Sequence, residues 1–281
     1  MTEVLFAALQ RGATLATANA RLARSMRREF NAAQLAAGKA AWPTPSILPW
    51  PAFVQQLWAR HAGGEAPVLT PIQEQALWES IVEASPESAS LIQPQAAARL
   101  AAEAWRLVHE WHVPITGKKR LPAWEATAET LAFHGWAQQF QFHARWLNRI
   151  DSAQQIEWLL NRAVTGPAAL WLAGFDELTP RQRALLAAIE QTGTQVTHFT
   201  AAAPPPARMG AASLAGFSDA TVETEAAAAW SRGRLEAHPH ARIGVVVQNL
   251  EQRRPAFERA FLLAVPNAFH ISLGPSLAAR P

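Results

Sequence analysis

Residues 170–189, LWLAGFDELTPRQRALLAAI, contain the three features that decide the fold of this chain. An apolar run suited to a buried strand leads into two carboxylates, Asp176 and Glu177, and then into a helix that Thr179 and Pro180 can begin. A buried strand that passes directly into a helix is typical of α/β proteins. The two carboxylates follow the strand, where α/β sheets place their ligands.

Further strand signals flank a long helical stretch. ATLATA (13–18) and SIL (46–48) precede it, and TQVTHF (194–199) and RIGVVV (242–247) follow it. Helical patterns lie between these runs, so we expect a parallel sheet with helices packed on its faces. RIGVVV is the cleanest apolar run of the chain, and we expect it to form a buried strand.

The stretch from Thr70 to about residue 163 has helical periodicity and almost no strand signal. Its first helix begins with a capping box formed by Thr70 and Gln73, and its last part predicts helix over about 124–163. Two aromatic stripes are expected to pack between these helices, with base stacking as the alternative. The stripes are Trp105, Val108 and His112, and Trp136, Phe140 and His143. The sheet is therefore expected to carry a large all-helical insertion.

Composition indicates a packed globular protein. Hydrophobic residues make up 49% of the 281 residues and charged residues 17%, which argues against disorder. Neither a run of about 20 apolar residues nor a signal-peptide pattern is present, so we expect a cytoplasmic protein that does not contact a membrane. The chain has no Cys, which excludes disulfides and thiolate metal ligands.

The charge of the chain points only weakly to nucleic acid. The sequence pI of about 10.1 follows from a net charge of +3 in a chain without Tyr or Cys. Nearly all cations are Arg, which suits phosphate binding, although a GC-rich genome gives the same bias. Arg21, Arg24 and Arg28 recur at helical spacing opposite an apolar spine of the helix expected at about 20–37. These three arginines, together with the Trp-rich helical insertion, are the candidate contacts for single-stranded DNA, and a solvated helix face is the alternative for the arginines.

A phosphate-binding loop is missing at the first strand. Such a loop needs G-x-x-x-x-G-K-[ST], whereas this chain has TANARLA at 17–23. Thr17 and Asn19 are expected to cap the helix instead. In a working nucleotide hydrolase Asp176 would hold magnesium and Glu177 would activate water, but here a structural role at the start of a helix is favoured. We therefore expect no catalytic residue, no metal site and no cofactor.

Several segments together resemble the AddB-like and RecB-like proteins of bacterial double-strand-break processing, in particular a proteobacterial group of DNA repair proteins. Their order along the chain carries the resemblance. The segments are TANARLARSMRREFNAAQLAAGKAAWPTPSILPW, FHARWLNRIDSAQQIEWLL, LAGFDELTPRQRALL, ETEAAAAWSRGRLEAHPHARIGVVV and FHISLGPSL. Members of this family join a helicase-like body, often degenerate, to a nuclease domain.

The resemblance implies a RecA-like (P-loop NTPase-like) α/β fold whose first domain comprises residues 1–75 and 151–235. Residues 76–150 would be the helical insertion, and 236–281 the beginning of a second, truncated RecA-like domain. Asp176 and Glu177 would be the remnant of a Walker B motif. The chain would be a fragment, and the full-length protein would be an exodeoxyribonuclease acting in DNA repair and recombination.

The resulting expectation is a helicase-like region with an inactivated nucleotide site, which binds or guides DNA and docks a helicase or nuclease partner subunit. One alternative is a protein-interaction scaffold that touches no DNA. Another is a metal-assisted hydrolase that uses Asp176 and Glu177 in a cleft.

Overall fold

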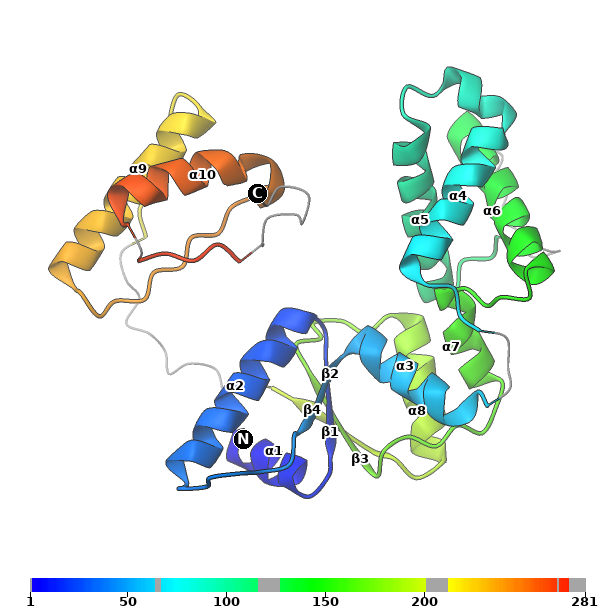
Figure 1. The fold of residues 1–281 in the computed structure, drawn as a ribbon, viewed down its shortest axis with the longest axis horizontal. Coiled ribbons are helices and arrows are strands. Elements are labelled where there is room, and N and C mark those ends of the chain that lie inside the picture. The colour runs from blue at the N-terminus through cyan, green and yellow to red at the C-terminus, as the bar shows by residue number, and fades with distance from the viewer. Residues whose placement is uncertain (1, 64–66, 116–126, 201–211, 267, 273–281) are drawn as a thin grey trace. The chain divides into compact units, whose positions relative to one another are not determined.

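The computed structural model describes residues 2–63, 67–115, 127–200, 212–266 and 268–272 (Figure 1). The chain divides into two units, Met1–Ala203 and Pro204–Pro281. The first unit contains a sheet, the helices on its faces and a block of further helices. Its elements are α1 (Thr2–Gln10), β1 (Thr14–Thr17), α2 (Ala20–Ala36), β2 (Ser46–Pro49), α3 (Trp50–His61), α4 (Pro71–Ala84), η1 (Pro86–Ser90), α5 (Pro94–Glu110), α6 (Ala128–Trp146), α7 (Ser152–Leu160), β3 (Ala169–Ala173), α8 (Pro180–Gln191) and β4 (Gln195–Phe199).

The sheet has four parallel strands in the order β2-β1-β3-β4. The expected α/β class and parallel sheet are therefore confirmed. Helices cover both faces (Figure 1), because successive side chains of a strand point to opposite sides. Leu15 of β1 packs against α1 and α2, whereas the next residue, Ala16, belongs to the core formed with α3, α7 and α8.

Helices α4, α5 and α6 lie side by side (Figure 1) and, with η1, form what we call the helical block, residues 71–146. Its core contains the aromatic residues expected to pack there. Trp78 stacks on Phe140 with ring centroids 4.3 Å apart, and Trp105 meets the same ring edge-on at 5.7 Å. Trp136 is also buried. Packing, and not base stacking, thus accounts for these rings, while His112 at the end of one stripe is exposed.

One helix prediction was wrong, and one helix was not predicted. The helix expected over 124–163 is interrupted, because Asn148 adopts a left-handed conformation (φ 51°) and Asp151 caps a new helix, α7; residues 124–126 lie outside the described ranges. The N-terminal helix α1 was not anticipated, although Leu5, Phe6 and Leu9 bury one of its faces.

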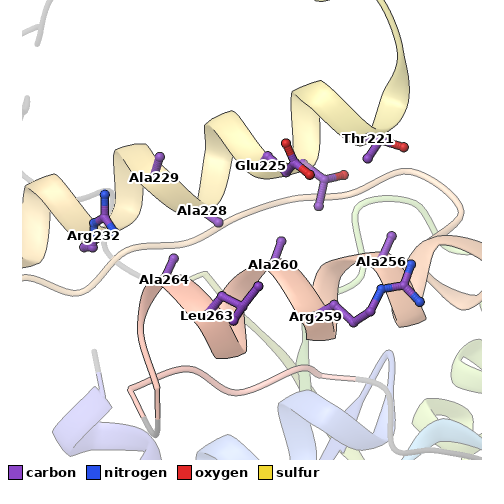
Figure 2. Close-up of a pocket in the computed structure, with 11 residues that line it drawn as sticks. Thr221, Glu225, Ala228, Ala229, Arg232, Ala256, Arg259, Ala260, Leu263 and Ala264 are labelled. Atoms are coloured by element: carbon purple, nitrogen blue, oxygen red, sulfur yellow. The ribbon is translucent and has the colours of Figure 1, made fainter.

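The second unit contains α9 (Ala220–Ala237) and α10 (Leu250–Ala264). Arg253 of α10 joins Glu223 of α9 in an ion pair of 2.7 Å. A groove of about 400 Å³ lies between the two helices. Five of its eleven lining residues are Ala, and Arg232 and Arg259 also line it (Figure 2). Contacts group α9 with α10 in this unit.

The buried strand expected at 242–247 is not formed. The segment has no strand assignment, and Val246 is 99% exposed. A strand requires a neighbour for its N–H and C=O groups, and no described segment pairs with this one. Only Val247 packs inward, against the Phe257–Phe261 core of α10.

Among the described residues, no helix combines the length and the apolar character that a membrane span requires.

Candidate nucleic-acid interface at the carboxyl edge of the sheet

The strand order creates a switch point between β1 and β3. From β1 the chain crosses to β2 on one side, whereas β3 continues to β4 on the other. In doubly wound sheets of this order, ligands bind outside the carboxyl ends of the strands at the switch point. Here that position is bounded by the β1–α2 turn and by the β3–α8 turn with Asp176 and Glu177.

The β1–α2 turn satisfies its own polar groups. The Asn19 side chain accepts a hydrogen bond from the Leu22 N–H at 2.9 Å and so caps α2, as expected. The buried Thr17 hydroxyl donates to the Asn19 carbonyl at 2.9 Å. The Ala18 N–H donates to the Ala173 carbonyl at 3.0 Å, which ties the turn to β3. Only two residues, Ala18 and Asn19, join β1 to α2, too few to wrap a phosphate.

A leucine fills the crevice between the two turns. Gly174 follows β3 with φ +76°, and a Cβ built on it would lie 2.4 Å from Leu22 Cδ2 and 3.7 Å from Ala18 Cβ. Leu22 of α2 therefore packs directly onto the Gly174 backbone. The left-handed conformation favours glycine at this position, whereas the close approach involves the end of the Leu22 side chain, which can shift.

Asp176 and Glu177 lie on the surface of the β3–α8 turn. Both are exposed, and neither forms a hydrogen bond or ion pair with another residue of the described ranges. The helix they precede is capped independently, because Thr179 and Gln182 form a reciprocal capping box. No group of three His, Asp or Glu side chains suited to a metal ion occurs in the part of the chain that the structure describes.

Arg21, Arg24 and Arg28 form an exposed row along α2, which we call the α2 arginine row. No carboxylate of the described ranges pairs with any of them. Arg27 instead points inward and donates to the Ile47 carbonyl at 2.7 Å. The α2 arginine row also lies in the part of the chain that carries the net positive charge. Residues 1–40 contain six Arg or Lys and two Glu, a net +4, whereas the whole chain carries +3, so residues 41–281 carry −1.

The structure brings together a polar cluster, with members that are partly or fully buried, that the sequence did not indicate. It lies where α4, α5, α7 and α8 meet and comprises Glu74, Trp105, His109, Asp151 and Arg181, which we call the junction cluster. Asp151 is fully buried and accepts hydrogen bonds from the Gln154 N–H at 2.9 Å and from Trp105 Nε1 at 3.4 Å. Arg181 of α8 is 3% exposed and donates to the Ala153 carbonyl.

Burial dominates the electrostatics of the junction cluster. It raises the pKa of the Asp151 carboxyl, although hydrogen bonds and the Arg181 charge act the other way. It also raises the pKa of Glu74, whose carboxylate accepts from the Ser152 N–H at 2.5 Å. Burial, with the charges of Arg181 and His112, lowers the pKa of His109 to about 4. The cluster joins the helical block to the sheet domain. In the sequence, the only indication of the junction cluster is Asp151, an Asp at the start of helix α7.

No protein-family model and no curated protein sequence matches this chain.

Proposed function

We propose that this chain is a non-catalytic, helicase-like region of a DNA repair nuclease, which binds DNA through the α2 arginine row and docks a partner subunit. In this proposal the sheet is a RecA-like domain, the helical block is its insertion, and Asp176 and Glu177 are remnants of a nucleotide site. The RecA-like assignment rests on the order of the sequence segments, because the strand order β2-β1-β3-β4 is also that of flavodoxin-type sheets.

The α2 arginine row is the single observation that carries the proposal. Three guanidinium groups lie on one exposed helix face, and none forms an ion pair within the described ranges, so they are free to contact successive phosphates. Fixed intramolecular ion pairs occupy Arg106 and Arg253 elsewhere in the chain. The Leu22–Gly174 contact supports the non-catalytic part of the proposal, because Leu22 packs where a phosphate would have to enter.

The docking part is supported by the segment 242–247. It is extended and apolar, with Val245 42% and Val246 99% exposed. An unpaired extended segment of this kind can add a strand to the edge of a partner's sheet. This observation also favours the second candidate function, a scaffold that binds protein and no DNA.

DNA binding is tested with fluorescein-labelled dT20 and a 20-bp duplex, with fluorescence anisotropy measured at 50 and 200 mM NaCl. Three phosphate contacts predict that the affinity for dT20 falls roughly 20-fold over this range. Substituting Arg21, Arg24 and Arg28 together by Ala should reduce the slope of log K against log[salt] by about 2 for dT20, and by more for the duplex.

A charge-matched control replaces Arg60, Arg99 and Arg183, which are exposed elsewhere in the first unit. This triple variant also loses three positive charges but should retain the wild-type slope. Equal slopes for the two triple variants would contradict the α2 arginine row as the contact surface. Absence of binding to either DNA at 50 mM NaCl would instead favour the scaffold.

A further inference from the structure

The last turns of α6 expose two aromatic side chains. Phe142 is 63% exposed, and Trp146, one helical turn further along, is 75% exposed. Both lie on the side of the helix opposite to Phe140 and Ala144, which pack in the core of the helical block. Leaving two large rings in water is unfavourable, so a face of this kind indicates a binding surface.

The charged residues that flank these rings in the sequence are both positive. Arg145 lies on α6 three residues after Phe142, and Arg149 follows Trp146 by three residues, just beyond the end of the helix. Between Ala137 and Arg149 there is no Asp or Glu. Neither arginine forms an ion pair in the described ranges. The surface therefore complements a ligand that offers both flat apolar groups and negative charge.

The ring of Trp146 has no aromatic or cationic partner among the described residues. Other tryptophans of this chain are already covered by a guanidinium, Trp158 by Arg162 at 3.8 Å and Trp230 by Arg234 at 5.7 Å. Phe142 meets His143 in a T-shaped arrangement, with ring centroids 5.6 Å apart, which covers at most one face of the Phe142 ring. Both rings can therefore accept a stacking partner.

We propose that Phe142 and Trp146, with Arg145 and Arg149, form a stacking platform for the bases of single-stranded nucleic acid. One helical turn separates the two rings by about 6 Å along the axis, whereas stacked bases in a duplex repeat every ~3.4 Å. The platform thus suits an extended, unstacked strand, in which aromatic rings hold bases and arginines hold the intervening phosphates.

This inference rests on the proposed DNA-binding function and specifies its substrate as single-stranded. It concerns a different surface from the α2 arginine row, and a different part of the ligand, the bases. The two can therefore fail separately.

The test compares dT20 with an abasic oligonucleotide of 20 phosphates, both fluorescein-labelled, by anisotropy at 50 mM NaCl. The wild-type protein should bind dT20 at least about fivefold more tightly for each ring engaged, because stacking contributes at least ~1 kcal/mol per base. In the double variant Phe142→Ala/Trp146→Ala this preference for dT20 should disappear, while affinity for the 20-bp duplex stays the same.

The matched control is Trp111→Ala, which removes a 45% exposed tryptophan at the end of α5 that is not followed by Arg or Lys in residues 112–115. It should retain the preference for dT20. Circular dichroism verifies that each variant is folded. Equal binding of dT20 and the abasic strand by the wild-type protein would overturn the platform, as would an equal loss in the Trp111→Ala variant. If the slope of log K against log[salt] is reduced only when Arg21, Arg24 and Arg28 are replaced, the proposal for the α2 arginine row stands even where the platform fails.

Discussion

Asp176 and Glu177 differ from the junction cluster in almost every physical respect. The first pair is conspicuous in the sequence, after a strand and before a helix, yet both carboxylates are exposed and neither has a partner in the described ranges. Asp151 and Arg181 are inconspicuous in the sequence but are buried among hydrogen-bond donors, acceptors and other charges. Position in a motif therefore does not determine the environment of a charge, and environment determines its energetic effect.

The largest expected effect is that of Arg181→Met. This change removes the positive charge that acts on the buried Asp151 carboxyl, and it leaves the Ala153 carbonyl without its donor. Loss of a hydrogen bond donated by a charged, buried group destabilises proteins by about 3 kcal/mol. Urea unfolding followed by tryptophan fluorescence measures the loss.

Arg183→Met is the control for this prediction. Arg183 lies on the same helix but is exposed, and it donates one hydrogen bond, to the Leu178 carbonyl. Its loss should cost no more than about 1 kcal/mol. Equal losses of unfolding free energy in the two variants would show that Arg181 contributes no more stability than an exposed arginine of the same helix.

Local chemistry explains which parts of this fold were predictable. Thr70 with Gln73 and Thr179 with Gln182 are complete capping boxes within four residues, and both helices begin where these residues predict. The segment 242–247 was misjudged for the opposite reason. Its apolar sequence shows that it can be a strand, but pairing depends on a neighbour that the segment itself does not contain.

The same distinction applies to the candidate sites. The missing phosphate loop and the α2 arginine row could be identified from residues adjacent in sequence or in helical register. The junction cluster could not, because Glu74, His109, Asp151 and Arg181 come from four helices spread over more than a hundred positions. Phe142 and Trp146 were not predicted individually, because helical periodicity indicates the buried stripe of a helix and not which residues of the opposite face bind a ligand.

A second prediction concerns the pH dependence of stability that His109 supplies. Its pKa is about 4 in the folded protein and 6.5 when unperturbed, so the unfolded chain binds more protons between these values. His109 therefore favours the folded state fully above pH 6.5 and progressively less as the pH falls toward 4. The partly buried ring should account for about 2–3 kcal/mol of lost stability across this window.

His109→Phe isolates this contribution, because it keeps a ring against Trp105, 4.2 Å away between centroids, and cannot be protonated. Asp151 and Glu74 have raised pKa values, so they act with the opposite sign, favouring the folded state as the pH falls. They are present in both proteins, and the difference in unfolding free energy between wild type and variant, measured from pH 7 to pH 4, reports His109. Parallel curves would show that the imidazole is not desolvated in the junction cluster.

The smallest expected effect is that of the double variant Asp176→Asn/Glu177→Gln. Exposed carboxylates without partners contribute little, and the unfolding free energy should change by no more than about 0.5 kcal/mol. In the same turn, Thr179→Ala removes the cap of α8 and should cost about 1 kcal/mol.

A functional pair of carboxylates would behave differently. Without metal, repulsion between the two charges would destabilise the folded protein, and a bound metal ion would stabilise it. If 10 mM MgCl2 stabilises the wild-type protein but not the double variant, or if the double variant is more stable by over 1 kcal/mol, Asp176 and Glu177 form a site and not a remnant.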